Sequence, residues 1–163
     1  MVAKKESASK SKDAIEVLIQ QHKEVQKMFK DFEKLKEGDE AEKAALVKEC
    51  CANLKIHAQI EEEIFYPAAR EALRDGDDLL DEAEVEHASV EDLITQLEGM
   101  TPGDDLYDAK FTVLGEYTNH HIKEEQDEMF PKVKKAKLDL GAIGKQLEQR
   151  TMQLKGKMGL LGE

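Results

Sequence analysis

The sequence predicts an all-α protein: an up-down-up-down antiparallel four-helix bundle followed by a short C-terminal helix. Apolar residues recur at steps of three and four along four long segments, which is the period of a helix with one buried face. The chain of 163 residues contains only 10 Gly and 3 Pro, which stand mostly between these segments. Short turns between long helices favour antiparallel neighbours. The length is sufficient for one domain with its own hydrophobic core.

The first two helices are expected to begin at acidic caps. Asp13 and Glu16 have the spacing of a capping box, and Asp39 precedes the second helix in a similar way. Residues 1–12, which are rich in Lys and Ser, are expected to form a flexible basic tail. Pro67 lacks a backbone N–H, so the second helix is expected to kink or break there.

The third helix is expected over residues 80–97, after an acidic turn. Thr101 and Pro102 offer a cap and a first helical residue for the fourth helix. Gly141 and Gly144 are expected to interrupt the pattern before a short final helix that lies across the bundle. The predicted organisation is a tail over 1–12, the bundle over 13–137 and a C-terminal helical extension over 138–163.

The charge of the chain excludes two classes of partner. Lys and Arg number 24 against 36 Asp and Glu, a formal net charge of −12. Such a surface repels the phosphates of nucleic acids and anionic membrane lipids. No apolar stretch reaches the ~20 residues of a transmembrane helix and no secretory signal is visible, so the expected location is cytoplasmic. The adjacent Cys50 and Cys51 are expected to be reduced thiols without a role as metal ligands.

Two stretches of the chain share one arrangement of functional side chains. In each, a His stands four residues before a Glu, and a Phe and a Pro follow. Residues four apart lie on one face of a helix, so each stretch can direct an imidazole and a carboxylate to one point. One further His precedes each stretch on the apolar face of the preceding helix. The six candidate metal ligands are His22, His57, Glu61, His87, His121 and Glu125.

Six such groups on core-facing positions need compensation, because burying unpaired imidazoles and carboxylates is costly. Hydrogen bonds between the imidazoles and the carboxylates would be one solution. A pair of divalent metal ions would satisfy all six at once, and nitrogen and oxygen donors without sulfur suit iron, manganese or zinc. Two histidines and two shared carboxylates per ion leave coordination positions open, as reactive metal sites require.

With this motif, the chain resembles the hemerythrin-like, or HHE cation-binding, domain family over about residues 13–133. The resemblance is carried by the order His, His-x-x-x-Glu, His, His-x-x-x-Glu. It implies a four-helix bundle around a non-haem di-iron (Fe) centre with an oxo or hydroxo bridge. It also implies the role of each ligand: terminal for His22, His57, His87 and His121, and bridging for Glu61 and Glu125.

Two positions depart from the oxygen-carrying members of that family. Glu91 stands where they have a fifth histidine, and Gln126 stands where they have an Asp. We therefore expect a di-iron protein that binds or reacts with dioxygen, peroxide or nitric oxide, in redox or oxygen sensing or in detoxification. The alternatives are a dedicated di-iron peroxidase or catalase-like enzyme and an iron-sensing or storage module. No protein partner is indicated, and the residues expected close to the metals are Glu91, Tyr117 and His120.

Overall fold

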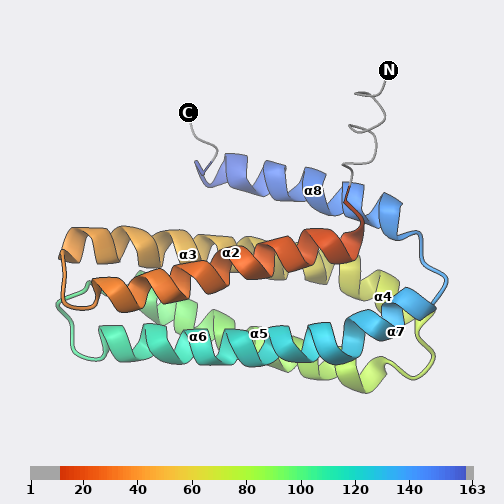
Figure 1. Cartoon of the computed structure of the whole chain (residues 1–163), viewed down its shortest axis with the longest axis horizontal. Helices are drawn as coiled ribbons and strands as arrows, with labels where there is room; N and C mark the ends of the chain where they lie inside the picture. Colours follow the sequence, from red (N-terminus) through yellow and green to blue (C-terminus); the bar gives the residue numbers. More distant parts are fainter. Residues whose placement is uncertain (1–11, 161–163) are drawn as a thin grey trace.

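Four long antiparallel helices form a bundle in the computed structural model, which describes residues 12–160. They are α2 (Ala14–Leu35), α3 (Glu40–Ile60), α5 (Asp77–Glu98) and α6 (Tyr107–Glu124). α2 packs against α3 and α6, and α5 packs against the same two helices (Figure 1). The predicted all-α four-helix bundle is confirmed. Apart from Lys12, the predicted basic tail over 1–12 lies outside the described residues.

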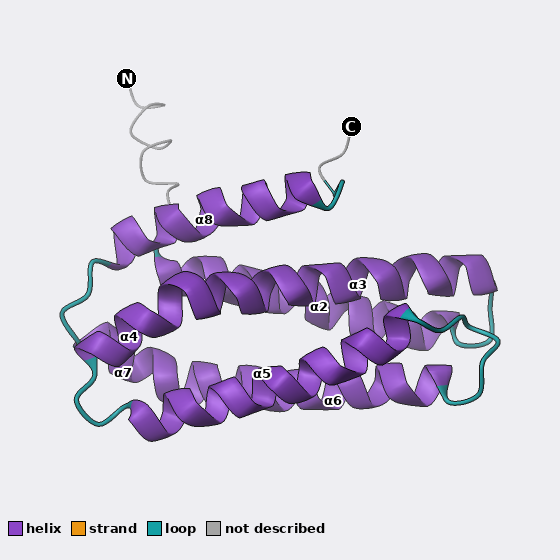
Figure 2. Cartoon of the chain, turned by 180° about the vertical axis from the view of Figure 1, so that it is seen from behind, coloured by secondary structure: helices purple, strands orange, loops and turns teal. Residues whose placement is uncertain are grey.

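α3 and α6 each continue into a shorter helix after a π-helical turn. η1 (Glu61–Phe65) leads to α4 (Tyr66–Ala72), and η2 (Glu125–Met129) leads to α7 (Phe130–Lys135). Figure 2 shows α4 and α7 side by side at one end of the bundle. A proline stands in the first turn of each, where no backbone N–H is needed. In place of the break expected at Pro67, the structure has a π-helical turn that ends at Phe65, two residues before the proline.

The expected helix starts are right for α2 and wrong for α6. Glu16 N–H donates to the Asp13 carboxylate at 2.9 Å, and Asp13 N–H donates to the Glu16 carboxylate at 3.0 Å, as in a capping box. α6 begins only at Tyr107, well after the expected start. Thr101 N–H donates to the Asp104 carboxylate at 2.9 Å, and Asp104 N–H donates to the Thr101 carbonyl. These two bonds close a turn where the helix was expected to begin.

α8 (Leu140–Lys157) packs along α2 and α3 (Figure 1). The Asp139 carboxylate caps its first turn. The expectation that Gly141 and Gly144 interrupt this helix is wrong, because both lie inside it. Gly144 faces the start of α2, where an added Cβ would lie 2.3 Å from the Lys12 carbonyl oxygen. The absence of a side chain at Gly144 thus lets α8 approach the backbone of α2 directly.

We expect Gly144→Ala to destabilise the protein by about 1–3 kcal/mol, because a clash with backbone atoms is not relieved by rotating a side chain. Gly141→Ala is the matched control. Its Cβ would lie 3.7 Å from the Asp139 carboxylate, an ordinary contact, and alanine is the better helix former. Urea unfolding midpoints measure both changes. Equal midpoints for the two variants would contradict the close approach of α8 to α2.

A polar layer divides the hydrophobic core into two apolar clusters. One cluster surrounds Phe65 and Phe130 near α4 and α7, and the other surrounds Phe32 and Phe111 toward the opposite end of the bundle. Within residues 12–160, no helix combines the length and the apolar character needed to span a bilayer. The polar layer between the clusters is therefore the feature of the core that requires an explanation.

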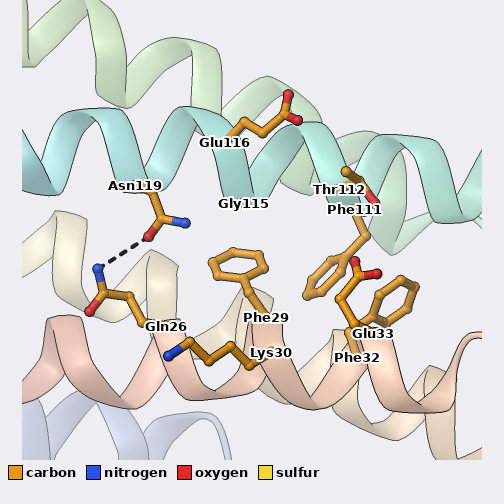
Figure 3. A pocket seen from close by; sticks show the side chains of 10 residues that line it. All are labelled: Gln26, Phe29, Lys30, Phe32, Glu33, Phe111, Thr112, Gly115, Glu116 and Asn119. Carbon is orange, nitrogen blue, oxygen red and sulfur yellow. Dashed lines mark hydrogen bonds between the residues drawn. The ribbon is translucent and has the colours of Figure 1, made fainter.

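A surface groove of about 420 Å³ lies between α2 and α6 (Figure 3). Phe29 lies over Gly115, where an added Cβ would stand 3.0 Å from the ring, and the Gln26 amide donates to the Asn119 side chain at 3.2 Å. The residues that line the groove include none of the six candidate ligands. We attribute the groove to the packing of α2 against α6 and place the functional site in the polar layer.

Candidate metal centre

The polar layer contains all six candidate ligands, one His from each long helix and one Glu from each π-helical turn. They are His22 on α2, His57 on α3, His87 on α5, His121 on α6, Glu61 in η1 and Glu125 in η2. All six are buried, and the two carboxylates are only 0% and 1% exposed. They form two groups of four, each with two histidines, and both groups share the two glutamates.

Each glutamate directs one oxygen to each group. Glu61 Oε2 lies 3.3 Å from His57 Nε2, and Glu61 Oε1 lies 3.0 Å from His87 Nε2. Glu125 is divided in the same way: Oε1 lies 3.1 Å from Nε2 of the α2 histidine, and Oε2 lies 3.3 Å from Nε2 of the α6 histidine. Two carboxylates with their oxygens divided between two groups have the geometry of bridges between two ions.

The outer nitrogen of each imidazole donates a hydrogen bond. On α2 and α3 the acceptors are amide oxygens: His22 Nδ1–H donates to Gln126 and His57 Nδ1–H donates to Gln21, each at 2.7 Å. With Nδ1 carrying the proton, Nε2 of the neutral ring directs a lone pair toward the centre. The outer partners therefore select the tautomer that a metal ion needs.

On α5 and α6 the acceptors are carboxylates instead. His87 Nδ1–H donates to Glu62 at 2.7 Å, and His121 Nδ1–H donates to Glu86 at 2.5 Å. A carboxylate partner makes an imidazole a more basic ligand than an amide partner does. The two groups of ligands are thus similar in arrangement and different in charge.

Tyr66, the first residue of α4, places its hydroxyl in the second group. Its oxygen lies 3.2 Å from His87 Nε2, 3.1 Å from His121 Nε2 and 3.0 Å from Glu61 Oε1. It also donates to Glu125 Oε2. A hydroxyl has one proton and cannot donate to four acceptors at once. The four acceptors therefore compete for one proton, and a cation at this point would accept a lone pair from each of them and from the Tyr66 oxygen.

The donor atoms of this layer fit cations. His87 Nε2 and His121 Nε2 lie 3.2 Å apart, and two lone pairs at this distance repel unless a proton or a metal ion lies between them. His57 Nε2 and Glu61 Oε2 are buried and close but not aligned for a hydrogen bond, so both lack a partner among the described residues. Ligand atoms about 2.1 Å from one ion and at right angles are about 3 Å apart, which is the spacing of these groups.

In the metal-free protein, protons take the place of the cations. Burial lowers the pKa of His121, but the charge of Glu125 and hydrogen bonds to carboxylates raise it to about 11. Burial also lowers the pKa of His87, and hydrogen bonds to Glu61 and Glu62 raise it to about 9. For Glu125, burial raises the pKa, but the charge of His121 and the hydrogen bonds outweigh it and hold the pKa well below 4.5. The buried charges therefore compensate one another until metal displaces the protons.

Two of the residues expected close to the metals lie elsewhere. Glu91 is exposed on α5, where it lines a surface groove and belongs to neither ligand group. Tyr117 is 49% exposed and lies on the outer surface beside Val85 and Glu86. Thr118 lies on the buried face of α6. Tyr117, the residue before it, is rotated toward the outer surface of the helix. Neither residue can reach the centre as predicted.

His120 was expected at the rim of the centre, and it is 65% exposed there. Its Nε2 lies 3.3 Å from Glu124 and 3.6 Å from Glu86. Glu86 in turn accepts the hydrogen bond of His121 Nδ1. His120 therefore contacts the centre only through Glu86 and is not one of the inner donors.

The sequence does not single out Tyr66, because a regular α-helix places it about 180° from His57 at about 100° per residue. The intervening π-helical turn changes this rotation. Its bonds join residues five apart, and Tyr66 N–H donates to the Glu61 carbonyl. The same turn brings the Tyr66 hydroxyl to the Glu61 carboxylate. Pro67, directly after Tyr66, is the available sequence signal, because it predicts that the regular helix ends here.

A small cavity of about 30 Å³ adjoins the four histidines, and Tyr66 is not among the residues that line it. About 10–15 Å³ is enough for one water molecule. The cavity therefore suits a ligand of two or three atoms. Tyr66 and the cavity therefore lie at different positions around the two ligand groups.

Cys50 and Cys51 are free buried thiols in the apolar cluster around Phe32 and Phe111. Burial raises the pKa of Cys51 to about 12 and raises that of Cys50 well above its ordinary value. Both thiols therefore remain protonated at neutral pH, and neither belongs to a ligand group of the described residues.

Comparison with known proteins agrees with this geometry. The model of the hemerythrin HHE cation binding domain matches residues 13–133, which is most of the chain. A crystal structure of a hemerythrin HHE cation binding domain-containing protein from Mycobacterium kansasii is similar, with a TM-score of 0.75 and 25% sequence identity over 90% of this chain and 89% of that one. No curated protein matches the chain. The chain therefore belongs to the hemerythrin HHE cation binding domain family, whose helical bundle binds metal ions.

Proposed function

We propose that this chain is a non-haem di-iron protein that reacts with dioxygen, peroxide or nitric oxide. The observation that carries the proposal is the division of each buried glutamate between two ligand groups. One ion would have four protein donors and the other five, counting Tyr66. A set of nitrogen and oxygen donors that leaves coordination positions open suits iron that reacts with a small molecule.

The residues of the chain bind, orient and shield the centre. Bound iron would supply the electrons for reducing an oxidant. The four imidazoles are held by their outer hydrogen bonds, so the donors are in place before the metal binds. The cavity admits a small ligand and excludes larger molecules. Glu62 is half exposed and connects His87 to solvent, so protons can leave the centre when metal enters.

Tyr66 favours one-way oxidation over reversible oxygen carriage. Glu91, which stands where oxygen carriers have a fifth histidine, is exposed and cannot supply the anionic donor. Burial and the two buried glutamates raise the pKa of Tyr66 well above 10 in the metal-free protein. A bound cation would reverse this effect, so the phenol would lose its proton to solvent and serve as an anionic oxygen donor. Such a donor stabilises ferric over ferrous iron.

The proposal is tested by loading the protein with ferrous iron without oxygen. We expect two irons per chain, and oxidation on exposure to air that is not reversed when argon replaces the oxygen. Metal analysis and the optical spectrum measure both. Saturation at one iron would rule out the paired centre. Return of the colourless form without added reductant would show an oxygen carrier, and repeated turnover of peroxide would show an enzyme.

Variants of the glutamates test the bridging geometry. Glu61→Ala and Glu125→Ala should each leave at most one iron per chain, because each carboxylate is proposed to contact both ions. Glu62→Ala is the control, since its carboxylate contacts only the outer nitrogen of His87. It should keep two irons, with affinity weaker by about 10–100-fold. Iron content after desalting separates these outcomes, and loss of both irons in the control alone would refute the assignment.

A further inference from the structure

We propose that the Thr118 hydroxyl donates a hydrogen bond to the small ligand that occupies the cavity beside the four histidines. Thr118 would thereby favour ligands with an accepting atom at the cavity wall, such as peroxide or azide. This inference rests on the di-iron function proposed above and adds a residue that determines ligand preference.

The cavity lies between the histidines and the next layer of side chains. Each long helix contributes one residue to this layer, three positions from its own histidine. Three of the four are apolar and one carries a hydroxyl. The four residues are Val25 on α2, Leu54 on α3, Val90 on α5 and Thr118 on α6.

The two halves of the chain share the order His, His-x-x-x-Glu, and this correspondence makes the hydroxyl at position 118 informative. Leu54 and Thr118 occupy equivalent positions, each three residues before the His of a His-x-x-x-Glu pair. The first half of the chain has an apolar side chain there, and packing alone would accept one in the second half as well. Thr118 has nearly the shape of valine, so what distinguishes it from an apolar residue is its hydroxyl.

That hydroxyl is buried and has no protein partner. Thr118 is 5% exposed, and its Oγ1 has no hydrogen bond to any residue of the described range 12–160. A threonine in a helix can donate to a carbonyl of the preceding turn, but here that bond is not made. A buried hydroxyl without a partner is unfavourable. Thr118 lines the adjoining cavity, and rotation about its Cα–Cβ bond turns the hydroxyl toward an acceptor there, which would remove this deficit.

The size of the cavity places the ligand within reach. At about 30 Å³, it accommodates only two or three atoms. A ligand of that size which lies against the histidines on one side also lies against the opposite wall, to which Thr118 belongs. The other residues of that wall, Val25, Leu54 and Val90, offer no hydrogen-bond donor from their side chains. Thr118 is therefore the donor available to a ligand on that side of the cavity.

The test is the affinity of the oxidised, iron-loaded protein for azide, followed by the charge-transfer absorption of the complex. Thr118→Val removes the hydroxyl and keeps the shape, and it should weaken azide binding by about threefold to tenfold. Thr118→Ser keeps the hydroxyl and should stay within about twofold of wild type. Thr112→Val is the matched control: the Thr112 Oγ1 is also buried without a partner on α6, but it lines the groove of Figure 3 and not the cavity.

The outcomes separate this inference from the function on which it rests. If the wild-type protein holds two irons and Thr118→Val binds azide with the same affinity as wild type, the role of Thr118 is refuted and the di-iron proposal stays intact. A wild-type protein that holds fewer than two irons would overturn both. If valine at position 118 prevents iron loading, Thr118→Ala is compared with Thr112→Ala instead, and equal azide affinities would again refute the role of Thr118.

Discussion

Iron loading should raise the melting temperature by on the order of 10 °C at about pH 8, and by much less near pH 5.5. A ligand present at a thousand times its dissociation constant stabilises the folded state by about 4 kcal/mol. About 1 kcal/mol shifts the melting temperature of a domain of this size by about 2–4 °C. The dependence on pH follows from the protons that the metal must displace.

The metal-free protein should be most stable in mildly acid solution. The pKa values of about 9 for His87 and about 11 for His121 exceed the ordinary value of 6.5. A histidine whose pKa is raised by folding stabilises the folded state fully below pH 6.5. This stabilisation is lost as the pH rises through 9 for His87 and 11 for His121. The pKa of Glu125 is lowered from 4.5, so its contribution is present above 4.5 and is lost as the pH falls. Both contributions are complete between about 4.5 and 6.5.

Bound iron should reverse this dependence. The metal needs the unprotonated Nε2 atoms of the histidines, so its binding releases protons and strengthens as the pH rises. The melting temperatures of chelated and iron-loaded samples should therefore diverge between about pH 6 and 9. Proton release during titration with metal in weak buffer provides a second measurement. Melting curves that shift in parallel with pH would show that His87 and His121 are not ligands.

Replacing Tyr66 with phenylalanine should abolish the phenolate-to-iron absorption of the oxidised protein and weaken the binding of one iron by about 10–100-fold. Tyr66 is 7% exposed and its ring packs against Phe65, and the variant keeps these contacts. The change therefore removes an oxygen donor and leaves the packing in place. Visible absorption and iron affinity measure the result.

Tyr117→Phe is the control for this experiment, because Tyr117 was the tyrosine that the sequence suggested and it is half exposed. It should leave both the absorption and the affinity unchanged. The opposite pattern, with the absorption lost in Tyr117→Phe and kept in Tyr66→Phe, would mean that the α-helical interpretation of the sequence was correct and that α4 is rotated in solution.

The bundle and the six inner residues could be predicted because they depend on a regular helical period. His57 on α3 and Glu61, the first residue of η1, are four residues apart, and a helix brings such pairs to one face whatever the tertiary contacts. The cap at Asp13 depends on a local hydrogen bond between residues three apart. These features need no knowledge of how the helices pack.

The residues that the sequence did not identify depend on departures from that period or on tertiary contacts. Tyr66 reaches the centre because a π-helical turn changes the rotation between it and Glu61. Gln21 and Glu86 are identified only when two helices are placed side by side, since each accepts a hydrogen bond from a histidine on another helix. Gly144 has no local signal that distinguishes a helix-breaking glycine from one at a close helix contact.

The amide partners on one side of the centre and the carboxylate partners on the other also affect electron transfer. His22 and His57 donate to amide oxygens, whereas the other two histidines donate to carboxylates and share their group with Tyr66. More negative charge around an ion lowers its reduction potential. Two irons in this bundle should therefore differ in potential, and the electron should leave first from the iron beside Tyr66. The other iron would have fewer protein donors, so the ion expected to be oxidised first would differ from the ion with more open coordination positions.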